Sequence, residues 1–140
     1  MAATTPSDFP SQAFADIFSA NQLFAREFVD SGLAGTARRG LAIITCMDSR
    51  INPLDIVGMK AGDVKILRNA GARVTDDVLR TLVLATYLLG VQRVLVMPHT
   101  DCRMTQEDES AIHEMIARQH GVDTRSLEFR TVTDQRATLL

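Results

Sequence analysis

The sequence predicts an α/β domain with a mainly parallel β-sheet of about four strands, flanked by helices and preceded by an N-terminal amphipathic helix arm. Two observations predict this architecture: the alternation of strand-like and helical segments, and a length that suits one domain. Short apolar runs suited to buried strands alternate with longer segments that show helical periodicity. The chain has 140 residues, which is the size of one domain with a core of its own. We therefore treat residues 1–140 as a single domain, in which residues 1–30 form the arm and its helix.

The arm begins with a small, polar, proline-containing stretch over residues 1–12, which we expect to be flexible or to wrap around another surface. A helix is expected over residues 14–28, where apolar side chains recur three and four positions apart. Five of the six phenylalanines lie between residues 9 and 28, so this helix is expected to cover an apolar surface, either its own sheet or a partner subunit. Residues 31–40 contain three glycines and read as a loop.

Four short segments are predicted to be strands: residues 41–46, 65–69, 93–97 and 127–132. The first, LAIITC, is a continuous apolar run of the kind found in strands that are buried on both faces. The third, RVLVM, runs directly into a proline and a histidine. Because helical segments separate these runs, the strands are expected to pair in parallel.

The helix between the second and third strands is expected over residues 75–89. Thr75 is a plausible N-cap, Asp76 and Asp77 complement the helix dipole in the first turn, and Gly90 follows the end.

The next helix is expected over residues 105–119, with Thr105 as its cap, Asp108 three positions further on, and its end near Gly121. The last residues, 134–140, read as the start of a further helix.

Composition narrows the class of partner. The net charge of −2 offers no electrostatic footprint for nucleic acid or for an anionic membrane. The longest apolar stretch, residues 82–91, is too short to span a bilayer, and residues 1–12 lack the pattern of a secretory signal. Two cysteines suit a reducing compartment better than a disulfide framework. We therefore expect a cytoplasmic protein with no nucleic-acid and no membrane partner.

Cys46, His99 and Cys102 form a candidate three-ligand zinc set. Cys46 closes one predicted strand and His99 follows another, so both lie at carboxyl ends of strands, where open α/β sheets bind their ligands. Zinc favours thiolate and imidazole, and a catalytic zinc keeps three protein ligands with one exchangeable position. A structural site would need a fourth Cys or His, and the chain has no further Cys. The set therefore indicates a catalytic zinc centre.

Asp48 and Arg50 follow Cys46 closely enough to act on the metal. Asp48 can occupy the fourth metal position itself, or Arg50 can hold its carboxylate away in a bidentate pair. An aspartate held off the metal could orient the reacting water. The plain alternative is a turn with a solvated ion pair of little energetic worth. His113 and His120 are both read as surface residues.

These residues match a known family. The chain resembles the β-class carbonic anhydrases over about residues 38–132, in three signature blocks and in the helix-forming run of residues 74–80. The blocks are Cys46-Met47-Asp48-Ser49-Arg50, Arg68-Asn69-Ala70-Gly71 and His99-Thr100-Asp101-Cys102.

The resemblance implies a zinc enzyme that hydrates carbon dioxide reversibly to bicarbonate and a proton. It implies that Cys46, His99 and Cys102 hold Zn²⁺ and that Asp48 and Arg50 form a gating dyad. It also implies a homodimer or a higher oligomer, with the N-terminal helix reaching over the partner.

Two positions depart from the family pattern. The family has glycine directly after the second cysteine ligand, where this chain has Arg103; if that position needs a positive φ, arginine costs stability or moves the loop. Family chains also continue through another helix to a final strand, and both are expected to be absent here. Two alternatives follow: a hydrolase of carbonyl sulfide or carbon disulfide, and a catalytically impaired zinc-binding or assembly protein. A dinucleotide-binding domain is rejected, because no G-x-G-x-x-G follows the first strand.

Overall fold

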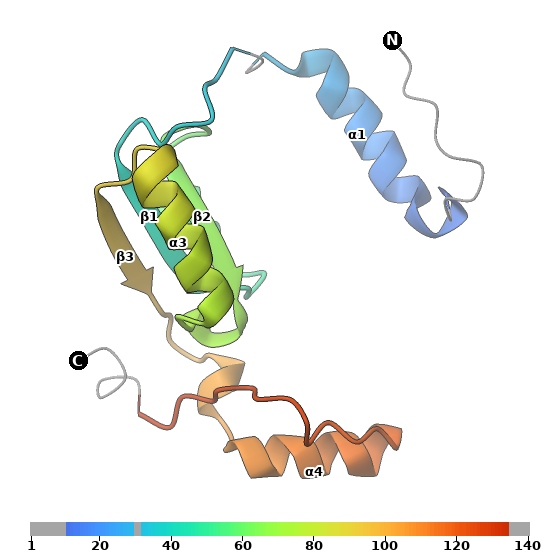
Figure 1. The fold of residues 1–140 in the computed structure, drawn as a ribbon. Helices are drawn as coiled ribbons and strands as arrows, with labels where there is room; N and C mark the ends of the chain where they lie inside the picture. The colour runs from blue at the N-terminus through green and yellow to red at the C-terminus, as the bar shows by residue number, and fades with distance from the viewer. Residues whose placement is uncertain (1–10, 30–31, 135–140) are drawn as a thin grey trace. The chain divides into compact units, whose positions relative to one another are not determined.

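The computed structural model describes residues 11–29 and 32–134, which belong to two compact units, residues 1–33 and 34–140. The first unit holds a short 3-10 turn η1 (Ser11–Phe14) and the helix α1 (Ala15–Glu27), drawn in blue in Figure 1. The helix expected over residues 14–28 is thus confirmed, with each end one residue shorter. None of its residues is buried, and the rings of Phe24 and Phe28 lie against each other with centroids 5.5 Å apart.

The second unit is built on three parallel strands in the order β2-β1-β3. They are β1 (Leu41–Cys46), β2 (Val64–Asn69) and β3 (Arg93–Met97), as the sequence predicted to within one residue. Every residue of β1 is buried, because this strand is central and both its faces are covered. Among the residues that the structure describes, Thr45 is the one fully buried polar side chain, and its hydroxyl donates to the Met97 carbonyl at 2.8 Å.

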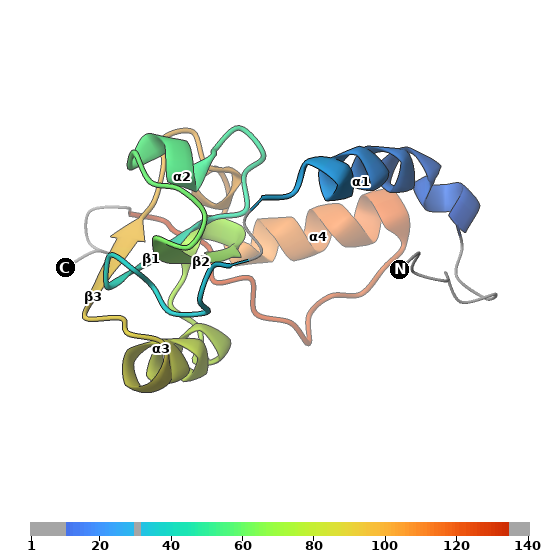
Figure 2. The same cartoon turned by 90° about the horizontal axis from the view of Figure 1, so that it is seen from above.

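Helices lie on both faces of the sheet, with α3 (Asp76–Leu88) on one side and the single turn α2 (Pro53–Ile56) on the other (Figure 2). The predicted cap of α3 is confirmed, since the Thr75 hydroxyl accepts the Val78 N–H at 3.4 Å. Ala85 of α3 packs in the core with three small or branched residues of the loops and the central strand. These are Ala37, Ala42 and Val91. The turn α2 is too short to show a helical period in the sequence.

The helix α4 (Glu109–His120) begins four residues later than predicted. Asp108 is its cap, because the Asp108 carboxylate accepts the Ala111 N–H at 2.8 Å. The hydroxyl of Thr105 instead donates to the Cys102 carbonyl, in a short 3-10 turn η3 (Arg103–Thr105). The predicted end at Gly121 is confirmed by its left-handed backbone, with φ of 67°.

The strand predicted over residues 127–132 is wrong, since this segment is irregular. Its backbone N–H groups bond elsewhere: the Glu109 carboxylate accepts those of Phe129 and Arg130 at 2.7 and 3.2 Å, and the Met104 carbonyl accepts that of Val132 at 2.8 Å. Its apolar alternation therefore reflects packing against α4 and η3 rather than a sheet. Residues 135–140 of the further predicted helix lie outside the described residues.

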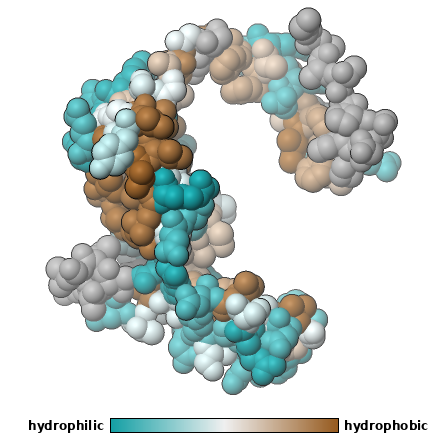
Figure 3. Space-filling model, viewed as in Figure 1, coloured by the Kyte–Doolittle hydropathy of each residue, from teal (hydrophilic) through white to brown (hydrophobic). Residues whose placement is uncertain are grey.

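Large apolar side chains remain exposed on α3, where Figure 3 shows a hydrophobic surface. They are Leu79, Val83, Leu84, Tyr87 and Leu88. None of the helices in residues 11–29 and 32–134 combines the length and apolarity needed to cross a membrane.

Candidate metal centre

Neighbouring strands bring Cys46, His99 and Cys102 together. Cys46 is the last residue of β1, and His99 follows the end of β3 by two residues. Because β1 and β3 pair in parallel, their carboxyl ends meet at one edge of the sheet. The ligand atoms of the three side chains lie within 4.8 Å of one another, and the two sulfur atoms are 3.8 Å apart. The structure thus assembles the group that the sequence singled out.

The imidazole of His99 is oriented by its own loop. Its Nδ1 lies 2.8 Å from the Thr100 carbonyl oxygen. A carbonyl only accepts hydrogen bonds, so Nδ1 carries the ring proton and Nε2 keeps its lone pair. Nε2 faces the site, 3.8 Å from Asp48 Oδ2. A metal-binding histidine is commonly fixed in this way, with the second nitrogen donating to a carbonyl.

The two thiols lie in different electrostatic surroundings. Burial raises the pKa of Cys46, but hydrogen bonds, above all those from the backbone N–H groups of Gly71 and Asp48, outweigh it, so the pKa falls below its usual value. The Gly71 N–H lies 3.4 Å from Cys46 Sγ. Burial also raises the pKa of Cys102, and the neighbouring Cys46 adds to that rise, so the net shift is upward. Cys46 is therefore the first of the pair to become a thiolate.

This donor set fits zinc. Two thiolates at about 2.3 Å from a tetrahedral zinc ion lie about 3.8 Å apart, which equals the separation of the two sulfur atoms here. One imidazole nitrogen completes three ligands, and the group contains no fourth Cys or His among the described residues. The chemistry and the spacing are those of a three-ligand zinc site.

Asp48 and Arg50 lie beside this group and bind each other. The Asp48 carboxylate accepts three hydrogen bonds from Arg50: from its backbone N–H at 2.9 Å, from Nε at 3.0 Å and from Nη2 at 2.8 Å. These bonds hold the pKa of Asp48 far below its usual range. Asp48 is thus an ionised acceptor close to the imidazole of His99, and its place as a metal ligand stays a prediction.

Two residues that sequence reasoning missed support the dyad. Arg68 at the end of β2 donates from Nε to the Cys46 carbonyl at 2.9 Å and from Nη2 to the Asp48 carbonyl at 2.7 Å. Asp101 accepts from Arg50 Nη1 at 3.1 Å. Both lie inside the blocks that carry the family resemblance, which is the only sequence signal for them.

Arg103 does not occupy a position that needs a positive φ, so the expected cost of arginine there does not arise. Its backbone has a negative φ within η3, and it is Asp101, two residues earlier, that has a φ of 55°. The Arg103 guanidinium bonds to the Glu107 carboxylate at 3.1 and 3.2 Å and to Gln106 at 2.9 Å. Its charge is therefore balanced by the residues just before α4.

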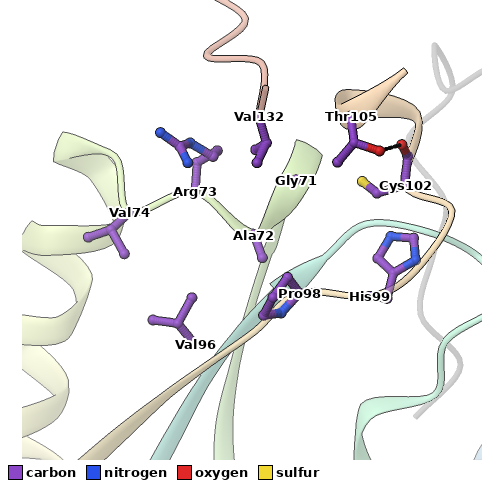
Figure 4. A pocket seen from close by; sticks show the side chains of 10 residues that line it. All are labelled: Gly71, Ala72, Arg73, Val74, Val96, Pro98, His99, Cys102, Thr105 and Val132. Carbon is purple, nitrogen blue, oxygen red and sulfur yellow. Dashed lines mark hydrogen bonds between the residues drawn. The ribbon is translucent and has the colours of Figure 1, made fainter. Parts of the chain in front are cut away.

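A cavity of about 250 Å³ opens beside the group (Figure 4). His99 and Cys102 line one part of it, and apolar side chains line much of the rest. These are Ala72, Val74, Val96, Pro98 and Val132. A small apolar molecule in this cavity would lie next to two of the three candidate metal ligands.

The two remaining histidines differ. His120 is exposed, as expected. His113 is not a surface residue: only 14% of its side chain is exposed, its Nδ1 lies 2.8 Å from the Thr124 hydroxyl, and its ring lies against Phe129 with centroids 4.8 Å apart. It joins α4 to the segment that follows.

Comparisons with known proteins identify the family. The family model described as carbonic anhydrase matches residues 41–136, which include all three candidate ligands as well as Asp48 and Arg50. The β-carbonic anhydrase 1 of Mycobacterium tuberculosis is 37% identical over 82 residues, which are 59% of this chain and 50% of that protein. The chain belongs to the β-class carbonic anhydrase family.

A solved structure and a further curated protein are also similar to this member of the β-class carbonic anhydrase family. A crystal structure of a carbonic anhydrase from Streptococcus mutans superposes with a TM-score of 0.82 at 36% identity, covering 89% of this chain and 75% of that one. A carbon disulfide hydrolase from Saccharolobus solfataricus is 44% identical over 66 residues, which are 47% of this chain and 32% of that enzyme. The chain spans about half the length of the mycobacterial relative.

Proposed function

We propose that this protein is a zinc-dependent carbonic anhydrase that converts carbon dioxide and water reversibly into bicarbonate and a proton. The observation that carries this proposal is the convergence of Cys46, His99 and Cys102, with ligand atoms within 4.8 Å of one another, in a member of this family.

The three residues would hold Zn²⁺ through two sulfur atoms and His99 Nε2. Bound there, zinc supplies a Lewis acid with one exchangeable coordination position. The protein contributes the fixed geometry. The Thr100 carbonyl sets the tautomer of His99, and the Gly71 N–H helps to hold Cys46 as a thiolate.

Asp48 orients the reacting water. Its carboxylate is ionised at neutral pH, because its hydrogen bonds to Arg50 hold its pKa far below the usual range. An ionised carboxylate only accepts hydrogen bonds, so it fixes a nearby water by taking one of that water's hydrogens. Arg50 has a second role as a gate: while it binds both oxygens of Asp48, it keeps this carboxylate from closing the fourth metal position.

The cavity suits the substrate. Carbon dioxide is small and apolar, and the walls formed by Val74, Val96 and Val132 offer it an apolar place beside His99 and Cys102.

We propose two further properties. Exposed apolar side chains on α1 and α3 support a homodimer or higher oligomer, because such surfaces commonly mark protein interfaces. The two free thiols, which zinc needs in reduced form, support a cytoplasmic location.

Hydrolysis of carbon disulfide is a second candidate, favoured by the 44% identity to the Saccharolobus solfataricus enzyme. Carbon disulfide is also linear and apolar, so the same metal group and cavity would receive it. The two candidates differ in product, since carbon disulfide and two waters give carbon dioxide and two molecules of hydrogen sulfide.

Stopped-flow carbon dioxide hydration tests the proposal on protein whose zinc content has been measured. We expect turnover in the wild type and in His120→Asn, and loss of both zinc and turnover in His99→Asn. Hydrogen sulfide release from carbon disulfide is measured on the same samples. Stoichiometric zinc without carbon dioxide turnover would refute the proposed carbonic anhydrase activity. Hydrogen sulfide release from the same sample would then establish carbon disulfide hydrolysis.

A further inference from the structure

The guanidinium of Arg50 is held by two loops at once. Its Nε and Nη2 donate to Asp48, at 3.0 and 2.8 Å, in the loop after β1. Its Nη1 donates to Asp101 Oδ2 at 3.1 Å, and its Nη2 also donates to the Asp101 carbonyl at 3.1 Å, in the loop after β3. Asp48 lies two residues after Cys46, and Asp101 directly precedes Cys102. Arg50 therefore connects the two loops that carry the metal ligands.

The backbone of Asp101 is arranged for this contact. Its φ of 55° lies in the left-handed region, which is uncommon for residues other than glycine but is tolerated best by Asp and Asn. Its second carboxylate oxygen accepts from Gln106 Nε2 at 3.3 Å, so the side chain is tethered on both sides although it is largely exposed. An unfavourable backbone conformation kept beside a reaction site is a reason to look for a function.

We propose that Asp101 is a positioning residue that fixes the Arg50 guanidinium independently of Asp48. A planar guanidinium gripped only through Nε and Nη2 can pivot on the carboxylate that grips it. A contact to Nη1 from a separate loop removes this freedom. The Asp101 carboxylate also balances the charge of Arg50 whenever Asp48 turns away, so the Asp48 carboxylate can move to and from the metal position while Arg50 stays in place. The catalytic consequence rests on the proposed carbonic anhydrase function.

The direct test is the rotation of the Arg50 side chain, measured by NMR on the full chain and assigned with an Arg50→Lys variant. Asp101→Gly removes the carboxylate without adding strain, because glycine accepts a φ of 55°. We expect the exchange of Nη1 with Nη2 to become about tenfold faster in this variant, because it loses one hydrogen bond to a charged group. Asp101→Asn keeps an acceptor oxygen and is expected to give an intermediate rate. Arg125, which binds Asp123 in the same manner, is the internal control in every spectrum.

Activity provides the second readout. We expect Asp101→Gly to lower kcat about tenfold while KM stays within about twofold, because the variant misplaces a group that acts after binding. Asp101→Asn is expected to recover part of this loss.

An unchanged Arg50 rotation in Asp101→Gly overturns the proposal, and so does faster rotation with an unchanged kcat. If the wild type has no turnover, the proposed function fails while the rotation rates still decide the role of Asp101. If Asp101→Gly does not fold, the rotation rate in Asp101→Asn decides it.

Discussion

The Asp48 carboxylate accepts three hydrogen bonds of 2.8 to 3.0 Å from Arg50, one from its backbone N–H and two from its guanidinium, at the edge of the metal group. The same three bonds recur between Asp123 and Arg125 after α4, at 3.0, 2.9 and 2.6 Å. The Asp-x-Arg hydrogen-bond pattern is therefore a local structural motif that also forms outside the metal group. The first pair differs in its surroundings, because Asp48 is only 17% exposed and lies 3.8 Å from His99 Nε2.

This duplication offers a matched test of Asp48. We expect Asp48→Asn to lower kcat for carbon dioxide hydration about a hundredfold, because a neutral amide is a poorer acceptor and presents an N–H to the water. Asp123→Asn removes a pair of the same geometry that belongs neither to the metal group nor to the cavity lining, and it is expected to leave kcat within about twofold. Stopped-flow kinetics on both variants at equal zinc content measures the difference. Equal losses of activity would contradict a special role for Asp48.

Gly71 is expected to tolerate no side chain. Its φ is 78°, and a Cβ there would lie 3.2 Å from Cβ and Cγ of Met104, while its N–H donates to Cys46 Sγ. Gly71→Ala should cost more than the roughly 1–2 kcal/mol of left-handed backbone strain and should weaken zinc binding. Gly121→Ala has a φ of 67° but open space around the new Cβ, so it is expected to cost the strain alone and to leave zinc affinity unchanged.

Denaturant unfolding and competition with a chelator measure these two effects. If both alanine variants lose the same stability and Gly71→Ala binds zinc as the wild type does, the close packing of Gly71 against Met104 is unimportant.

Glu109 is expected to anchor the segment that lines the cavity at Val132. Its two carboxylate oxygens accept the backbone N–H groups of Phe129 and Arg130. Glu109→Gln leaves one of these donors facing an amide NH₂, and we expect both amides to exchange with solvent about tenfold faster, which corresponds to about 1.4 kcal/mol of local stability. Glu107→Gln, which alters an exposed contact to Arg103, is the control. Unchanged protection of Phe129 and Arg130 would show that other contacts hold this segment.

The Asp63 carboxylate is expected to make stability depend on pH. A backbone hydrogen bond from Lys60, followed by the contact with Arg38, lowers its pKa in the folded state. A depressed folded-state pKa gives stability that is fully present above the unfolded value of about 3.9 and is lost as pH falls through the lower folded value. Asp63→Asn should therefore be less stable than the wild type at neutral pH, and the difference should shrink below about pH 4. Urea unfolding from pH 3 to 7 checks this, and a difference that grows on acidification would contradict it.

Local signals in the sequence predicted much of this structure. The buried run of β1, the cap at Thr75 and the helix end at Gly121 depend on neighbours within a few residues, so they can be recognised without a fold. The metal group could be predicted for a related reason: Cys46 ends one predicted strand and His99 follows another, and parallel pairing alone brings such residues to one edge.

Contacts between distant segments could not be predicted in the same way. The alternation of residues 127–132 resembles a strand, yet Glu109, some twenty residues away, takes the N–H groups that a sheet would need. The link between Arg50 and Asp101 spans 51 positions and depends on a left-handed backbone at Asp101. The burial of His113 could not be predicted either, because its contacts with Thr124 and Phe129 form only when the chain turns back along α4.

Zinc K-edge X-ray absorption on this chain tests the central claim most directly. The account predicts a first shell of two sulfur atoms at about 2.3 Å and two nitrogen or oxygen atoms at about 2.0 to 2.1 Å, with one sulfur lost in Cys102→Ser. A first shell without sulfur, or one that Cys102→Ser leaves unchanged, would contradict zinc binding by Cys46, His99 and Cys102.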